Sequence, residues 1–392
     1  MKKTPMLLAM MIIATGQVGV SIYLPSLPLI SQTLSASQAD VQLLVTLFLV
    51  GFGASQLFYG PLSDAIGRRP VFILGQGIYL LGTVICLLFA SSLQLLILGR
   101  LLQGLGAGSA SVLGRSVLRD SYDGAQLTRA LSYISVTASI MPIMAPVMGG
   151  WLAFYLGWQS VFVFVLIYLI AIFTLGYFVL PETMTYGKSR FSVTQVMTNY
   201  RDLITSRQVL SSASYNWISY LASLVSLSVM PFLLQHELGL TAGHYGSIMI
   251  IPSAGLMIGS VTLNMLNRSF SARQILALSV TLIVTAGIWL LLAPMTLVNL
   301  VAPFTLLAVA QGLSFPISIS MLLEPHKRQA GAVSALSGSI QMCLAGLFGG
   351  YLVENWVDSP TTMGLFYLVC ALLMSLVLIS SRLKHSVQQE FA

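Results

Sequence analysis

Charged side chains are scarce in this chain of 392 residues. Asp, Glu, Lys and Arg make up only 7% of the sequence, whereas hydrophobic residues make up 56%. Soluble globular domains carry about 25% charged residues, so this composition excludes that class and indicates a membrane protein.

Cysteine and histidine are also few. Cys86, Cys343 and Cys370 all lie inside apolar runs, which predicts free thiols rather than a disulfide framework. The sequence contains no His/Cys cluster, phosphate-binding loop or nucleophile elbow. It therefore predicts neither an enzyme nor a metal site, and we expect no cofactor.

Twelve apolar runs have roughly the 20 residues that an α-helix needs to cross a membrane. Open strands are excluded because hydrocarbon offers no partner for an unpaired backbone group. The predicted fold class is therefore an all-α membrane protein with twelve transmembrane helices. The runs cover residues 5–28, 40–61, 70–90, 93–113, 130–152, 158–180, 208–234, 243–265, 272–293, 297–320, 331–353 and 361–381.

Basic residues are absent from every second loop. All Lys and Arg residues except Arg100 lie at the two termini or in the loops that follow the even-numbered runs. Cytoplasmic loops carry the excess of Lys and Arg, so we expect both termini in the cytoplasm. This orientation explains the net charge of +7, and we expect lipid rather than nucleic acid as the partner.

The chain divides into two similar parts. The longest polar stretch, residues 182–207, follows the sixth run and predicts a cytoplasmic linker between an N-terminal half, 1–181, and a C-terminal half, 208–392. Two short motifs recur in the same order, which indicates duplication of a six-helix unit. They are Gln103-Gly104-Leu105 with Gln311-Gly312-Leu313, and Gly149-Gly150-Trp151-Leu152 with Gly349-Gly350-Tyr351-Leu352.

The turn between the second and third runs is a decapeptide from Gly60 to Arg69, GPLSDAIGRR. Its charged residues cannot stay in hydrocarbon, so it lies at a membrane surface. It resembles the loop between spans two and three of the major facilitator superfamily, G-x-L-x-D-x-x-G-R-R/K. The resemblance implies a major facilitator fold of two six-helix halves. It also gives Gly60 a conformational role, and Asp64, Gly67, Arg68 and Arg69 roles in gating or proton coupling.

The same resemblance implies an ion-pair cluster at the cytoplasmic surface, with Arg68 near Asp120 and Asp64 near the start of span eleven. A carboxylate is favourable at a helix N-terminus. The alternative is a solvated basic cluster that only fixes the orientation.

Span four contains Leu96-x-x-x-Arg100-x-x-Gln103-Gly104, which resembles the second motif of the superfamily. A charge inside a span is costly and indicates function by default. The alternative is a structural role in which Arg100 binds backbone carbonyls of neighbouring helices. Without a central carboxylate, the expected partners of Arg100 are backbone carbonyls, neutral groups such as Gln17, or the substrate.

Span five contains Pro142, Pro146, Gly149 and Gly150, which resemble the G-P-x-x-G-G motif of antiporters, with Ala145 at the first glycine. Prolines bend a helix, so the resemblance implies a compliant span in a gate between the halves. The alternative is simple close packing of helices.

Polar or flexible residues on apolar spans are the candidates for a substrate cavity. For each of them, bridging between helices is the competing role. The candidates are Gln17, Met144, Asn216, Tyr220 and Gln341.

Acidic residues are absent from the centre of every span. Proton relays in membranes usually use buried Asp, Glu or His, and Arg100 cannot release a proton. A carboxylate nearer a membrane face must therefore carry the proton, with Asp64, Asp120 and Asp40 as candidates in that order.

Within the superfamily, the chain most resembles the twelve-span drug:proton antiporters of the EmrD and Bcr/CflA types. This implies a functional monomer in the bacterial inner membrane that exports small amphipathic or hydrophobic drugs by alternating access, with protons as the coupling ion. Two alternatives are uptake of a specific metabolite by symport or facilitation, and a non-transporting membrane sensor or scaffold.

Overall fold

The computed structural model describes residues 3–122, 124–180, 182, 193–325 and 330–390, and its described elements are all helices. The first group comprises α1 (Lys3–Ser21), η1 (Leu24–Ser26), α2 (Leu27–Leu34), α3 (Gln38–Ile66), α4 (Arg68–Leu88), α5 (Leu93–Ser121), α6 (Gly124–Leu156) and α7 (Gln159–Val179). After α8 (Val193–Thr205), the second group comprises α9 (Arg207–Phe232), η2 (Leu233–Glu237), α10 (Ala242–Ile248), α11 (Ile250–Leu266), α12 (Ala272–Leu292), α13 (Leu297–Leu323), α14 (Ala330–Cys343), η4 (Leu344–Phe348), α15 (Gly349–Asn355) and α16 (Pro360–Glu390).

These helices make the predicted membrane spans. Within the described residues, 11 segments are long and apolar enough to cross a bilayer, and α6 supplies a further span with its apolar stretch Met144–Leu156. Four spans are interrupted: the first between α1 and α2, the seventh at η2, the eighth between α10 and α11, and the eleventh at η4. The predicted ranges therefore located each span but did not show these interruptions.

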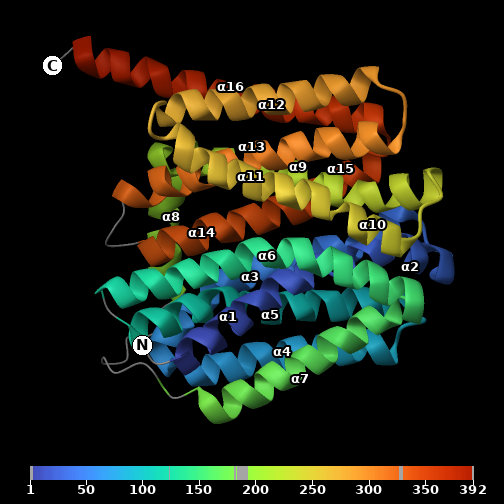
Figure 1. Cartoon of the computed structure of the whole chain (residues 1–392). Coiled ribbons are helices and arrows are strands. Elements are labelled where there is room, and N and C mark those ends of the chain that lie inside the picture. The colour runs from blue at the N-terminus through green and yellow to red at the C-terminus, as the bar shows by residue number, and fades with distance from the viewer. Residues whose placement is uncertain (1–2, 123, 181, 183–192, 326–329, 391–392) are drawn as a thin grey trace.

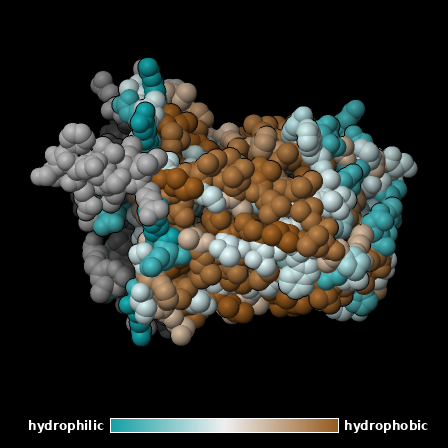
Figure 2. Space-filling view, turned by 90° about the horizontal axis from the view of Figure 1, so that it is seen from above, coloured by the Kyte–Doolittle hydropathy of each residue, from teal (hydrophilic) through white to brown (hydrophobic). Residues whose placement is uncertain are grey.

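The two groups lie side by side with their helices roughly parallel, and the ends of the bundle differ (Figure 1). The start of α1, the end of α16 and α8 lie at one end, called here the α8 end, whereas α2 and α10 lie at the other, the α2/α10 end. Figure 2 shows a broad hydrophobic surface between two more hydrophilic ends. This is the pattern expected where lipid tails cover the middle of a bundle.

Short local signals set the ends of α3. Asp40 closes a capping box with Ser37: the Ser37 backbone N–H donates to Asp40 Oδ2 (3.0 Å), and the Asp40 N–H donates to Ser37 Oγ (3.1 Å). At the other end Gly67 has a φ of 111°, a value that residues other than glycine rarely adopt. Gly67 is thus the single residue between the end of α3 at Ile66 and the start of α4 at Arg68.

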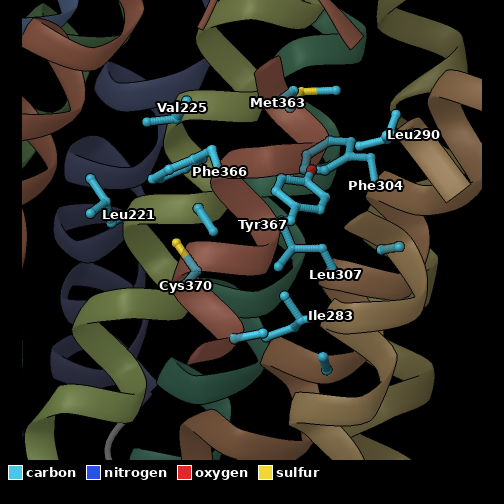
Figure 3. Packing of buried hydrophobic residues seen from close by; sticks show 14 of the residues in the cluster. Leu221, Val225, Ile283, Leu290, Phe304, Leu307, Met363, Phe366, Tyr367 and Cys370 are labelled. Atoms are coloured by element: carbon cyan, nitrogen blue, oxygen red, sulfur yellow. The ribbon is translucent and has the colours of Figure 1, made fainter. Parts of the chain in front are cut away.

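Part of the core of the second group lies where α9, α12, α13 and α16 meet (Figure 3). Tyr367 of α16 lies at its centre, and its hydroxyl is 2.6 Å from Ser226 Oγ of α9. The phenol is therefore paired although it is fully buried. The surrounding labelled side chains come from α9, α12, α13 and α16: Leu221, Val225, Ile283, Leu290, Phe304, Leu307, Met363, Phe366 and Cys370.

The repeated motifs have the same packing role in both groups. A Cβ on Gly104 would lie 2.0 Å from the carbonyl oxygen of Phe48 in α3, and one on Gly312 would lie 2.2 Å from that of Leu256 in α11. Each glycine thus lets span four or span ten touch the backbone of span two or span eight. This equivalence supports the duplication that the sequence predicts.

The close contact at Gly104 gives a stability prediction. Gly104→Ala must push α3 and α5 apart, so we expect it to lower the free energy of unfolding by about 1–3 kcal/mol, as overpacking does. The matched control is Gly77→Ala in α4, where an added Cβ has nothing within 4 Å. There we expect no loss, and a gain of up to about 1 kcal/mol from helix propensity. Thermal unfolding in detergent measures both, and equal midpoints for the two variants would contradict the packing argument.

Candidate functional site

Arg100 of α5 is buried, with 2% of its surface exposed, and each hydrogen-bond acceptor around it is neutral. Its Nε donates to the Leu44 carbonyl of α3 (3.2 Å), and its Nη2 donates to the Gly19 carbonyl of α1 (3.0 Å). Its Nη1 donates to Oε1 of Gln103 (2.7 Å), one turn along the same helix. The side chain therefore binds α1 and α3 to α5.

Two aromatic rings complete the environment of this cation. The guanidinium carbon lies 3.7 Å from the ring centroid of Tyr23 and 4.1 Å from that of Phe48. Desolvated cation–π contacts contribute about 2 kcal/mol or more each, which offsets part of the cost of burying the charge.

The Gly19 carbonyl is available because the first span is interrupted. The last carbonyls of any helix have no intrahelical donor, and α1 ends at Ser21, shortly before Pro25. The Val18 carbonyl accepts from the Ile22 N–H (3.0 Å), and Arg100 supplies a donor to Gly19. Arg100 thereby completes the end of a broken membrane helix.

A short polar chain extends this site to α4. Gln103 Nε2 donates to Oγ1 of Thr83 (2.8 Å), whose hydroxyl donates to the Tyr79 carbonyl (2.9 Å). The sequence analysis expects carbonyls and Gln17 as partners of Arg100. The carbonyls are present, but Gln103 takes the place expected for Gln17, which is half-buried. The sequence analysis does not predict that Arg100 contacts the Tyr23 and Phe48 rings. The available signal is that Tyr23 lies two positions before Pro25, next to the interruption of the first span.

A second site surrounds Arg68 at the α8 end, in the turn between α3 and α4. The buried side chain of Arg68 forms ion pairs with Asp64 (Nη1–Oδ1, 2.6 Å) and with Asp120 at the end of α5 (Nε–Oδ2, 2.9 Å). Its Nη1 also donates to the Ser63 hydroxyl. The contact with Asp120 is the one that the resemblance implies. We call Asp64, Arg68 and Asp120 the Arg68 cluster.

Glu182 closes this site from the end of the first group. Its Oε1 accepts from the Arg68 backbone N–H (2.9 Å) and its Oε2 from the Arg69 N–H (3.3 Å), so the carboxylate caps the N-terminus of α4. A Cβ on Gly67 would lie 2.3 Å from Glu182 Oε2, which is a second reason for glycine there. The sequence analysis does not assign Glu182 to a site. The available signal is that this acidic residue follows the sixth span and so lies on the same side of the membrane as the turn between spans two and three.

Arg69 also holds α4 to α7. Its Nη2 donates to the Tyr177 carbonyl (2.8 Å), and its guanidinium carbon lies 5.5 Å from the Tyr177 ring centroid. The contacts of the described residues do not test the expected approach of Asp64 to the start of span eleven at residue 331. That approach stays a prediction.

The paired glycines of α6 lie where the two groups meet at the α2/α10 end. A Cβ on Gly149 would lie 1.7 Å from the Ile22 carbonyl oxygen of the first group, and one on Gly150 would lie 2.4 Å from the Ala242 carbonyl oxygen of the second. Gly246 of α10 faces the same crossing, with the Pro146 carbonyl oxygen 2.6 Å from its Cβ position. The side chain of Pro142 is outside the described part of α6.

The second copy of this pair has the same arrangement. Gly349 faces Leu221 of its own group, whereas a Cβ on Gly350 would lie 2.2 Å from the Thr46 hydroxyl of α3 in the other group. One glycine of each pair therefore packs inside its group and the next packs across the interface.

The cavity candidates separate into two sets. Asn216 Nδ2 of α9 donates to Oε1 of Gln341 in α14 (2.7 Å), and the Tyr220 hydroxyl lies 3.5 Å from the Met342 sulfur. These three candidates thus bridge two helices of the second group, as the competing role predicts. Gln17 and Met144 lie in the first group and take part in neither of these contacts. Met144 is 42% exposed.

Comparison with known proteins identifies the family. Residues 7–350 match the sequence profile of the Major Facilitator Superfamily. The chain belongs to that superfamily. It is 30% identical over 367 residues to the multidrug resistance protein MdtL of Shigella dysenteriae, a match that covers 92% of this chain and 90% of MdtL. MdtL of Escherichia fergusonii is 29% identical over 362 residues, with the same coverage of 92% and 90%.

A solved structure has the same fold. The crystal structure of a bacterial homologue of the human lysosomal transporter Spinster, in an inward-facing and unoccupied conformation, matches 97% of each chain with a TM-score of 0.71 and 15% identity. At that identity the match shows the fold alone. The predicted twelve-helix major facilitator fold is confirmed, and the protein is a transporter rather than an enzyme.

The contact between Glu182 and α4 gives a second prediction. Glu182→Ala removes the acceptor for two N–H groups, so we expect it to lower the free energy of unfolding by about 1 kcal/mol, the usual effect of losing an N-cap. Glu182→Gln keeps an amide oxygen as acceptor and should lose less. Thermal unfolding of the two purified variants measures the difference, and a larger loss for Gln than for Ala would refute the capping role.

Proposed function

We propose that this protein exports small amphipathic or hydrophobic drugs from a bacterial cell by drug/proton antiport. The observation that carries the proposal is the similarity to MdtL, a multidrug resistance protein, along 92% of the chain. Export by antiport requires a site that is open to one side of the membrane at a time. Two groups of helices with separate contacts at the two ends of the bundle are suited to that cycle.

The contacts between the two groups at the α2/α10 end support alternating access. Gly150 and Gly246 bring the backbones of α6 and α10 together, and Trp151 Nε1 donates to the Ser247 hydroxyl across the same crossing (3.2 Å). Gln235 of η2 also donates to the Pro25 carbonyl (2.9 Å). Opening this end requires α6 and α10 to separate, and the small residues allow them to meet again without side-chain rearrangement.

The Arg68 cluster is the proposed site of proton coupling. Its two carboxylates face one buried guanidinium, so protonation of either Asp64 or Asp120 removes a negative charge from beside a cation. That change weakens the cluster and loosens the ends of α3, α4 and α5 at the α8 end. Asp40 is the weakest of the three candidates, because its carboxylate already caps α3.

Arg100 is proposed to fix the geometry of the first group while drug and proton are exchanged. Its hydrogen bonds go to two carbonyls and one amide, which support a positioning role rather than ion pairing. Lysine has one ammonium group and lacks the planar fork that binds several acceptors at once. Arg100→Lys is therefore not a conservative change.

The proposed orientation places the α8 end in the cytoplasm. Arg68 and Arg69 lie at that end, and cytoplasmic faces carry the excess of basic residues. We propose the bacterial inner membrane as the location and a functional monomer surrounded by lipid. The proposed division of the chain is an N-terminal half 1–181, a linker 182–207 and a C-terminal half 208–392.

A facilitator or a metabolite symporter on the same fold is the second candidate. It is favoured by one observation, the absence of Asp and Glu from the middle of the described spans. A facilitator needs no titrating group, whereas an antiporter does.

The coupling test uses purified protein in liposomes that contain a pH-sensitive dye, with ethidium as the transported probe. We expect ethidium movement to change the internal pH. One of the two substitutions Asp64→Asn and Asp120→Asn should abolish that change. Arg68→Ala and Arg100→Lys should reduce transport at least tenfold, because about 1.4 kcal/mol shifts a two-state ratio by that factor.

The control is Asp202→Asn, which removes an exposed carboxylate of α8 and should change neither signal. Ethidium movement down its own gradient with no pH change would replace the antiporter with the facilitator. Accumulation of a solute in cells that express the protein would favour the symporter.

Orientation is tested with reporter fusions. We expect cytoplasmic activity for fusions at Lys188 and at Ala392, and periplasmic activity for a fusion at Asp358, because the loop around Asp358 carries no Lys or Arg. A cytoplasmic signal at Asp358 would overturn the proposed orientation.

A further inference from the structure

A proline in α3 leaves one backbone carbonyl without its usual donor. In an α-helix the carbonyl of residue 57 accepts from the N–H of residue 61, but residue 61 is proline and has no N–H. The donor comes from elsewhere in the chain: the Tyr200 hydroxyl of α8 donates to the Leu57 carbonyl (3.1 Å). The tyrosine is 8% exposed, so this is a buried contact in which an unpaired acceptor would be costly.

Apart from this bond, α8 packs mainly on the second group. Tyr200 and Leu203 share a hydrophobic cluster with Val209, Ala213 and Trp217 of α9, Leu322 of α13, and Val333 and Leu336 of α14. The indole N–H of Trp217 donates to the Ser337 carbonyl (3.1 Å), which holds α9 to α14 beneath this cluster. Tyr200 therefore connects a helix seated on the second group to a helix of the first group.

A second proline has a hydroxyl near the carbonyl that it frees. Pro316 of α13 frees the Gly312 carbonyl, which lies 3.3 Å from the Ser260 hydroxyl of α11, and that hydroxyl also lies 3.1 Å from the Leu256 carbonyl of its own helix. That contact joins two helices of the same group. The bond from Tyr200 differs because it joins the two groups. Its acceptor, Leu57, lies in α3 seven residues before Asp64 of the Arg68 cluster.

We propose that Tyr200 is a positioning residue that fixes the α8 end of α3 against α8 and the second group in the conformation described here. This inference rests on alternating access, the mechanism of the proposed function. When α3 moves away at this end, the phenol and the Leu57 carbonyl separate, so their hydrogen bond favours the present conformation. Burial raises the pKa of the Tyr200 phenol, which keeps it protonated as a donor at neutral pH.

The dependence on proline makes the proposal testable by a double-mutant cycle. Tyr200→Phe removes the donor, and Pro61→Ala restores an N–H that can satisfy Leu57 within α3. We expect Tyr200→Phe to speed backbone hydrogen exchange of α8 and of the last turns of α3 about tenfold, which corresponds to about 1.4 kcal/mol. In the Pro61→Ala background the same substitution should speed exchange less than about twofold.

The matched control is Tyr168→Phe in α7. The Tyr168 hydroxyl donates to the Met11 carbonyl (2.9 Å), but residue 15 is threonine and keeps its N–H, so that carbonyl retains a helical donor. This variant should not change exchange in α8 or α3. Equal effects of Tyr200→Phe in the two backgrounds, or no effect in either, would overturn the proposal.

A transport measurement on the same variants separates this proposal from the proposed function. Tyr200→Phe should lower ethidium export severalfold in the otherwise unmodified protein, and less so in the Pro61→Ala background. If the unmodified protein moves no ethidium and no other drug, the proposed function fails, while the exchange experiment still tests the contact. If the protein exports drug and the exchange rates show no coupling between residues 61 and 200, only the proposal about Tyr200 fails.

Discussion

Every backbone carbonyl that a broken membrane helix leaves without a donor must find another donor inside the protein, because lipid offers none. This constraint explains two of the polar contacts between helices. Arg100 supplies the donor where α1 ends at Ser21, and Tyr200 supplies it beside Pro61. In each case a side chain from another helix completes the backbone, so the interruption of one helix fixes the position of its neighbour.

The same constraint accounts for the form of the Arg100 site. A buried guanidinium needs acceptors for its N–H groups, and the interrupted first span provides one in the Gly19 carbonyl. The Tyr23 and Phe48 rings add electrostatic attraction without adding a charge. The site therefore joins α1, α3 and α5 without a carboxylate, and the carboxylates paired with arginine in the first group lie instead at the α8 end, around Arg68.

Glycine decides where the backbones of the two groups can approach each other. At Gly150 and Gly246 the contact is between main chains. Side-chain hydrogen bonds from Trp151 to Ser247 and from Gln235 to Pro25 add to it. At the α8 end the Tyr200 hydroxyl joins α8 to α3, and that bond depends on a single donor.

Sequence alone determined the twelve spans, the membrane class and the superfamily, because span length, the scarcity of charge and the Gly60–Arg69 motif are local properties of the chain. The family resemblance also implied the contact of Arg68 with Asp120, and backbone carbonyls were among the partners expected for Arg100. Only the tertiary structure showed that Tyr23 and Phe48 enclose Arg100, that Glu182 caps α4, and that Tyr200 completes α3. Each of these contacts joins residues from different segments, and which carbonyl lacks a donor depends on where a helix is interrupted and on what packs beside that point.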